Sequence, residues 1–372
     1  MVKCSNKGAF ELDHSFSGQN TKGEKVTFTK EKMINGDYDL GKLFGIDFKN
    51  KECIPDRSIL KEVTFTKNIY LGLNKIFQSF YRISKRQKQG VSELEEIIGP
   101  DYVNMNFIGE PGTGKSFSLR AICAVLGIPM RVEAFSGDSG TDKFLGISSI
   151  AHGEIRFNWT AVPVTHRDGG VIALEEINQM KTDRQMALSQ AVVSPFILEV
   201  DNYMDTYRNP YTIYVNLFNV GTEGSKPFNE AYLNRFSTTY VFEKDDRETI
   251  IAKLHQKLGY PTETPKHLDS FTFKPRKLIK TDFEVAVDIL DNVKNYLNGD
   301  MVARNDEAKT ISERQSANML VEIQNGIEPK DAAVLTFVNT LACIDLELAA
   351  EVKEEVIDIF PWEYRYNSEK EQ

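Results

Sequence analysis

The sequence predicts an α/β fold in which a parallel sheet is sandwiched by helices, followed by a helical lid and preceded by a small N-terminal extension. Strand-like apolar segments alternate with helical segments over residues 103–242, which is typical of a mainly parallel sheet covered on both faces. Beyond Lys244 the apolar residues recur at helical spacing instead. The expected strands are Val103–Ile108, Met130–Phe135, Gly170–Leu174, Thr212–Phe218 and a segment beginning at Val241.

Changes of pattern divide the chain into four parts. Residues 1–67 are polar, dotted with glycine and weakly patterned, and we expect them to form an extension that binds a partner. Residues 68–243 form the expected α/β core, residues 244–360 the helical lid and residues 361–372 a charged tail. The expected helices include 71–83, 116–126, 182–193, 246–258, 281–297, 312–324 and 329–360.

Two features near the N-terminus have simple structural interpretations. The near-identical segments KVTFTK (25–30) and EVTFTK (62–67) alternate apolar and polar residues, which predicts two short edge strands. The basic run Lys85–Lys88 ends the helix that follows them. Such a run is typical of a solvated helix end, and contact with nucleic acid is the alternative.

Composition excludes several classes of protein. The 372 residues carry a formal net charge of -9, which argues against a protein that coats nucleic acid. No apolar run approaches the roughly 20 residues of a membrane-spanning helix, and the start of the chain lacks the apolar stretch of a secretory signal. The four cysteines form no CxxC pair, and the five histidines show no zinc-binding spacing. We therefore expect a cytoplasmic protein with free thiols.

A glycine-rich segment directly follows the first strand of the expected core. Gly109–Ser116, GEPGTGKS, fits the pattern G-x-x-x-x-G-K-[ST] between a strand and a helix. Glycines let backbone N–H groups curl around an anion, and the helix N-terminus adds unpaired donors. Lys115 is expected to reach the β- and γ-phosphates of ATP and Ser116 to bind Mg²⁺. A chance glycine-rich turn is the alternative, which both flanking elements disfavour. The expected nucleotide-binding residues are Gly109, Glu110, Pro111, Gly112, Thr113, Gly114, Lys115, Ser116 and Phe117.

An acidic pair ends the expected strand at Gly170–Leu174. Carboxylates at the carboxyl end of a strand face the ligand crevice of an open α/β sheet. We assign Glu175 to the Mg²⁺ shell and Glu176 to the water that attacks the γ-phosphorus. A solvated acidic strand end is the alternative.

Three further side chains are candidates for the same chemistry. Asn219 follows the strand Thr212–Phe218 and is expected to fix the attacking water beside Glu176, although asparagine is also common in turns. Arg235 and Arg314 can bind phosphate through their planar guanidinium groups. A surface ion pair is the usual role of an arginine, and the pattern alone does not single these two out.

These segments, in this order, resemble an AAA+ ATPase of the MoxR or dynein-related branch over about residues 95–360. The resemblance implies that Asn219 is the sensor-1 residue and Arg235, in the segment that ends Leu-Asn-Arg-Phe, is the arginine finger. It also implies that Arg314 is the sensor-2 residue, with Arg276 a weaker candidate. Residues 141–146 resemble the family segment after the second strand, so 147–159 would be the hairpin that the family inserts next.

The sequence departs from the family pattern at three positions. Glu175 stands where the family usually has aspartate, Val220 where it has proline, and Asn234 where it has aspartate. Glutamate keeps the charge but adds a methylene, which changes the reach to Mg²⁺. No departure removes a catalytic charge, so we expect the ATPase activity to survive.

The resemblance implies a hexameric ring with Mg²⁺ and ATP at the subunit junctions. It further implies a protein partner that the ring remodels or activates, with a von Willebrand A-type protein as one candidate. A nucleic-acid motor of restriction or defence type is an alternative, supported only by Lys85–Lys88 and Lys274–Lys280. A nucleotide-binding scaffold with little hydrolysis is the other.

Overall fold

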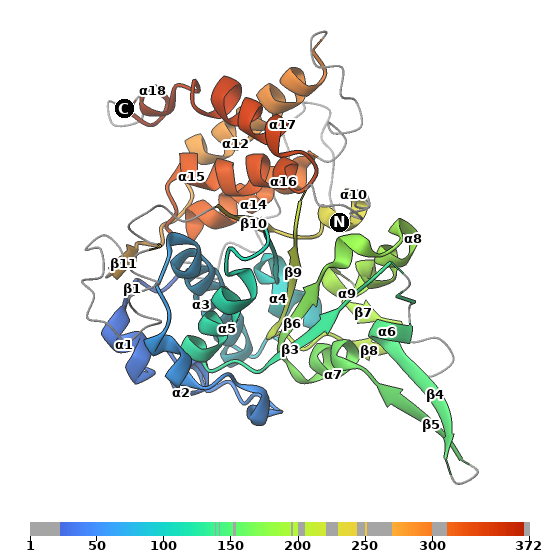
Figure 1. The fold of residues 1–372 in the computed structure, drawn as a ribbon. Coiled ribbons are helices and arrows are strands. Elements are labelled where there is room, and N and C mark those ends of the chain that lie inside the picture. Colours follow the sequence, from blue (N-terminus) through green and yellow to red (C-terminus); the bar gives the residue numbers. More distant parts are fainter. Residues whose placement is uncertain are drawn as a thin grey trace.

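The computed structural model places the sheet and its helices in the lower part of the molecule and the helical lid above them (Figure 1). The residues that it describes are 23–137, 139–140, 142–151, 154–194, 196–199, 205–220, 230–243, 250, 270–299 and 311–367. Most of the helix expected at 246–258 and the residue Thr141 lie outside them.

A five-stranded parallel sheet forms the centre of the α/β core, as the sequence predicts. The strand order is β10-β2-β9-β6-β3. The strand β2, which comes first along the chain, therefore lies between β10 and β9, which come last. Every residue of β2 and β9 is buried, because both faces of these central strands are covered. The strands are β2 (Val103–Gly109), β3 (Met130–Ala134), β6 (Gly170–Glu175), β9 (Thr212–Phe218) and β10 (Thr238–Phe242).

Helices cover the sheet, and the longest of them lies before the first strand. Helix α3 (Lys67–Lys88) contacts β2, β10 and helix α5 (Lys115–Leu126). The two helices approach so closely that a Cβ on Gly72 would lie 2.8 Å from Ile122 Cδ1. Helix α7 (Ala161–Asp168) packs on β3 and β6. The remaining short helices of this region are α4 (Leu94–Ile98), α6 (Asp142–Leu145), α8 (Thr182–Gln185), α9 (Ser189–Val192) and α10 (Glu230–Leu233).

Two short hairpins accompany the main sheet. Strands β4 (Gly146–Ala151) and β5 (Glu154–Trp159) pair antiparallel and project away from the sheet (Figure 1). This hairpin lies at the position that the family resemblance implies. Its first strand exposes Ile147 and Ile150, the latter to 80%. The second hairpin joins β7 (Ile197–Leu198) to β8 (Thr206–Tyr207).

The N-terminal extension packs on both the core and the residues that lead into the lid. Strand β1 (Val26–Thr29) pairs antiparallel with β11 (Ser270–Phe273), and helices α1 (Lys30–Asn35) and α2 (Leu40–Phe44) follow. The strand expected within 62–67 is wrong, because Val63–Thr66 has no regular structure. Val63 and Phe65 are nevertheless buried, so the alternating pattern reflects burial without a partner strand.

The lid is helical, and its last expected helix is interrupted. Asp345 caps a new helix by accepting hydrogen bonds from the N–H groups of Glu347 and Leu348, which ends the helix expected over 329–360. The lid helices are α12 (Lys280–Leu297), α14 (Glu313–Gln324), α15 (Pro329–Ala333), α16 (Asn339–Ala342), α17 (Leu346–Val352) and α18 (Trp362–Asn367). No helix among the described residues combines the length and apolar character needed to cross a membrane.

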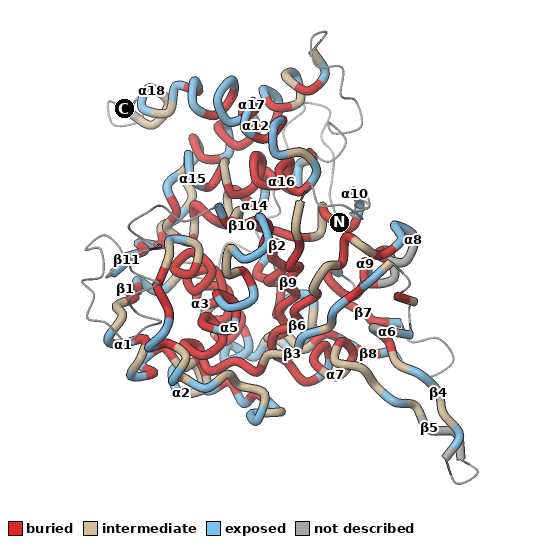
Figure 2. Tube along the Cα trace, viewed as in Figure 1, coloured by how far each residue is buried: buried red, intermediate tan, exposed pale blue. Residues whose placement is uncertain are grey.

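Buried charges join α3 to the lid at the centre of the molecule, where burial is most continuous (Figure 2). Lys75 Nζ lies 2.7 Å from Glu322 Oε1, with side-chain exposures of 1% and 3%. Thr238 Oγ1 donates to the same carboxylate at 2.8 Å. Further along α3, Arg82 donates to Asn325 Oδ1 at 2.8 Å and pairs with Asp101 at 2.7 Å. Asn325 lies at the end of the lid helix that carries Glu322. These contacts join α3, the sheet and the lid in a single buried network.

We predict that Glu322→Ala lowers the free energy of unfolding by about 3–5 kcal/mol, because it leaves Lys75 buried without its counter-charge. Urea denaturation measures the change. Asp331→Ala is the matched control, since it breaks the exposed pair between Lys67 and Asp331. The control is expected to cost less than about 1 kcal/mol. Equal effects of the two substitutions would contradict the importance of the buried pair.

Candidate nucleotide site

The glycine-rich segment forms a loop between the end of β2 and the start of α5. Gly112 and Gly114 have φ angles of 82° and 87°, which only glycine adopts readily. At Gly109 the limit is space, because a Cβ there would lie 2.2 Å from the carbonyl oxygen of Phe242 in β10. The loop therefore leads into the N-terminus of α5 with its backbone close to the sheet edge, which is a geometry suited to phosphate.

Lys115 is the first residue of α5, and its side chain folds back over the loop. Its ammonium group donates to the carbonyl oxygens of Gly109 and Glu110, both at 2.9 Å. It also donates to Asn219 Oδ1 at 2.8 Å, beyond the end of β9. Burial lowers the pKa of Lys115, and the nearby carboxylate of Glu176 opposes that shift. The charge is thus held next to the loop, between β2 and β9.

The acidic pair lies on the other side of this ammonium group. Ser116 Oγ donates to Glu175 Oε1 at 2.8 Å. Glu176 follows in a left-handed conformation with φ of 55°, and its N–H donates to Leu217 O in β9 at 2.8 Å. Asn219 Nδ2 donates to Glu176 Oε1 at 2.8 Å. Asn219 therefore joins the lysine to the second glutamate.

A cavity of about 380 Å³ opens between these side chains. The nucleotide-site candidates Gly109, Glu110 and Thr113 do not line it; Glu110 instead holds the loop by accepting a hydrogen bond from Thr113 Oγ1 at 2.9 Å. The lining residues are Pro111, Gly112, Gly114, Lys115, Ser116, Phe117, Glu175, Glu176, Leu217 and Asn219.

The residues present fit a magnesium ion that is bound together with a nucleotide. Within the described part of the chain, no group of three histidine, cysteine, aspartate or glutamate residues is arranged to hold a metal alone. Mg²⁺ at nucleotide sites needs fewer protein ligands, because phosphates and waters complete its shell. The contact between Ser116 and Glu175 already brings a hydroxyl and a carboxylate together, and the longer glutamate reaches the serine.

The two candidate arginines lie together, away from this cavity. Burial and the neighbouring charge of Arg314 lower the pKa of Arg235, whose guanidinium donates to Ala231 O. Arg314 approaches the carbonyl oxygen of Asn234 at 3.5 Å. Neither arginine lines the cavity of its own chain. They lie next to each other where α14 meets the segment after α10.

The weaker candidate, Arg276, is held elsewhere. It forms two hydrogen bonds with Asp282, at 2.7 and 2.6 Å, and the carboxylate of Asp282 is fully buried. Tyr366 donates to the same carboxylate at 3.0 Å. The geometry therefore assigns Arg276 to the internal packing of the lid.

Two asparagines that the sequence did not single out hold the backbone of candidate residues. Asn178 Nδ2 donates to Asn219 O at 3.0 Å, which holds the backbone of that residue. Asn104, buried at the start of β2, donates to the carbonyl oxygen of Arg235 at 2.8 Å. Asn178 lies two residues after the acidic pair, which is the only signal of its role. Asn104 stands out only as a polar residue in an apolar strand.

Comparison with known proteins identifies the domain. Residues 104–236 match the family model of the AAA domain, dynein-related subfamily. An uncharacterised protein of Staphylococcus epidermidis is 28% identical over 186 residues, which cover 45% of this chain and 67% of the relative. A protein from a second strain of that species matches to the same extent. The crystal structure of a candidate ATPase from Cytophaga hutchinsonii aligns with a TM-score of 0.48 and 14% identity, over 78% of this chain and 94% of that one.

Residues 104–236 thus match an AAA domain of the dynein-related subfamily, and a domain of this kind implies ATP binding. We predict that Lys115→Ala abolishes measurable ATP binding, a loss of at least about 30-fold, because the phosphates lose their buried cationic partner. Titration with a fluorescent ATP analogue measures the affinity. Lys42→Ala, at an exposed lysine of α2, is the control and is expected to bind as the native chain does. Unchanged affinity of the Lys115 variant would contradict the assignment.

Proposed function

We propose that the chain is a magnesium-dependent ATPase that assembles into a hexameric ring and remodels or activates a protein partner. One observation carries the proposal: Asn219 bonds to both Lys115 and Glu176 at the mouth of the phosphate loop. The proposed phosphate-binding cation and carboxylate base are therefore joined through one amide, which is the proposed water-orienting group. This is the set of groups that hydrolysis of a γ-phosphate requires.

Each side chain has a role that follows from its position. Lys115 binds the β- and γ-phosphates, for which it exchanges its present contacts with loop carbonyls. Asn219 orients the attacking water, and Glu176 accepts the proton of that water. Ser116 and Glu175 would hold Mg²⁺, which neutralises phosphate charge when it is bound.

The positions of the arginines support assembly. Catalysis of phosphoryl transfer commonly needs an arginine at the transferring group, and neither Arg235 nor Arg314 lines the cavity of its own chain. We assign Arg235 to the site of a neighbouring subunit as its arginine finger. Arg314, directly beside it on the lid, links that finger to the position of the lid.

The distribution of charge favours a protein partner over nucleic acid. Two of the four basic residues in the segment 274–280 form ion pairs within the lid, Arg276 with Asp282 and Lys280 with Glu284. The projecting hairpin offers apolar side chains, Ile147 and Ile150, rather than a basic stripe. A von Willebrand A-type protein is the partner class that the sequence resemblance suggests. Stimulation of the ATPase by DNA across a salt series would instead favour a nucleic-acid motor.

We predict that Glu176→Gln lowers the rate of ATP hydrolysis by about 10²- to 10⁴-fold while ATP binding persists, because the amide cannot accept the proton of the attacking water. Phosphate release measures turnover, and the fluorescent analogue measures binding in the same preparation. Hydrolysis at the native rate would reject Glu176 as the base. Absence of hydrolysis in the native chain would favour a nucleotide-binding scaffold.

We predict that Arg235→Ala lowers hydrolysis by about 10³-fold or more without loss of ATP binding. Mixing tests whether this arginine acts in trans. Chains with Lys115→Ala bind no ATP but carry Arg235, whereas chains with Arg235→Ala bind ATP but lack the finger. An equal mixture of the two inactive variants is expected to regain activity. If the mixture stays inactive and light scattering finds only monomers in ATP, the ring proposal is wrong.

A further inference from the structure

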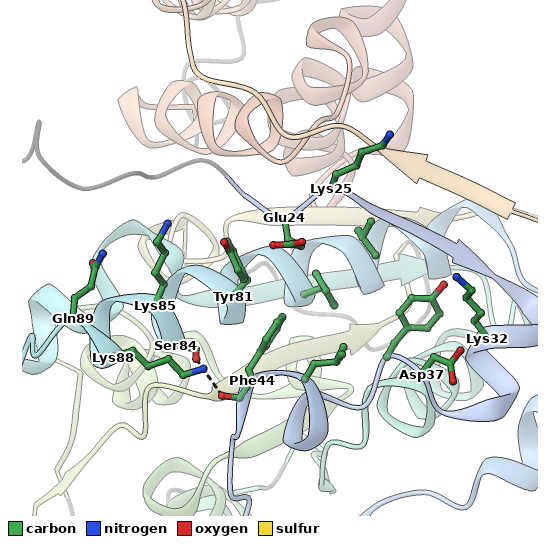
Figure 3. A pocket seen from close by; sticks show the side chains of 14 residues that line it. Glu24, Lys25, Lys32, Asp37, Phe44, Tyr81, Ser84, Lys85, Lys88 and Gln89 are labelled. Carbon is green, nitrogen blue, oxygen red and sulfur yellow. Dashed lines mark hydrogen bonds between the residues drawn. The ribbon is translucent and has the colours of Figure 1, made fainter.

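A second and larger cavity, which shares no lining residue with the candidate nucleotide site, lies between the N-terminal extension and α3. Its volume is about 750 Å³. Figure 3 shows the side chains that line it. The extension forms one wall, with Lys32 and Asp37 at its edge, and α3 forms the other, with Tyr81, Lys85 and Lys88. The remaining lining residues are Glu24, Lys25, Val26, Tyr38, Leu43, Phe44, Phe77, Ser84 and Gln89.

The floor of this groove is aromatic and already in place. Phe44 packs edge-on against Phe77, with 5.1 Å between the ring centroids, and lies against the tilted ring of Tyr81 at 5.8 Å. Gln78 of α3 donates to the backbone oxygen of Glu24, which holds the residues that lead into β1 against the helix. The groove therefore exists before any ligand arrives, and a ligand need not order it.

The rim of the groove has the opposite charge to the chain as a whole. Four lysines and two carboxylates line it, whereas the formal net charge of the chain is -9. Burial raises the pKa of Tyr81, and the negative charge of Glu24, one of the two carboxylates, raises it further. The lysines thus leave a local positive potential above an apolar floor.

These features select the chemistry of the occupant. The floor is recessed, since Tyr38 and Phe77 are buried, so it does not offer the exposed stacking platforms that bind successive bases. Glu24 and Asp37 would also oppose the continuous phosphate charge of a nucleic acid. A peptide that carries an apolar side chain between carboxylates matches both the floor and the rim.

We propose that this groove is the docking site for an acidic, aromatic or leucine-bearing segment of the protein partner. The inference rests on the proposed function only in taking that partner as the one the ATPase acts on. Helix α3 presents the groove on one face, and on its other face Arg82 and Arg86 pair with buried Asp101. Docking therefore occurs on a rigid helix that contacts both the phosphate-loop helix α5 and the lid.

The test is panning of a phage-displayed library of random peptides on the full chain without nucleotide. Recovered peptides are then labelled and titrated by fluorescence anisotropy against three chains: the native one, the double variant Lys85→Glu/Lys88→Glu, and the control Lys42→Glu. We expect recovered sequences rich in aspartate or glutamate beside phenylalanine, tyrosine or leucine. We expect the double variant to lose about tenfold or more in affinity, because its rim repels the carboxylates. The control lysine lies on α2 outside the groove, so its variant should bind as the native chain does.

Several outcomes would overturn the proposal. These are recovered peptides without acidic residues, equal affinity of the native and double-variant chains, or a single-stranded DNA oligonucleotide that binds this groove more tightly than every peptide. If the double variant fails to fold, a salt titration of the native chain decides, since affinity that does not fall with salt contradicts docking by charge. No step uses ATP, so a chain that failed to hydrolyse ATP would still give a clear answer about docking.

Discussion

The side chain of Asn219 is the contact on which the candidate site depends, because it is the only group bonded to both Lys115 and Glu176 among the contacts described. Its oxygen accepts from the lysine and its nitrogen donates to the glutamate. An amide can do both at once, whereas an ionised carboxylate in the same place could only accept and would repel Glu176. The strand order makes the contact feasible, since β9 lies between β2 and β6.

Much of this arrangement could be predicted because its signals are local. A few residues of sequence are enough to recognise a glycine loop between a strand and a helix, or carboxylates at the end of a strand. The parallel sheet then brings the strand ends to one edge, which the alternation of elements also indicates. The side chains of Lys115, Ser116, Glu175, Glu176 and Asn219 do lie together. Their catalytic roles remain predictions.

Other features could not be predicted because they depend on distant partners. The alternation at Val63–Thr66 has the period of a strand, but no strand among the described residues pairs with it. The same alternation at Val26–Thr29 does form a strand, β1, because β11, far along the chain, lies beside it and pairs with it. Asp345 starts a new helix within residues 329–360, whose apolar spacing predicts one continuous helix. The pairing of Lys75 with Glu322 joins residues whose charges alone suggest exposure.

The pairing of β1 with β11 also bears on how the protein can be shortened. A boundary drawn at residue 67 from the sequence would remove β1, leave both edges of β11 unpaired and take away the contact between Phe28 and Phe273. Unpaired edges with aromatic side chains invite self-association. Aggregation of such a shortened chain would therefore indicate that the pairing of β1 with β11 is lost, and would not show that a binding function is missing. The smallest version that behaves well in solution should begin before Val26.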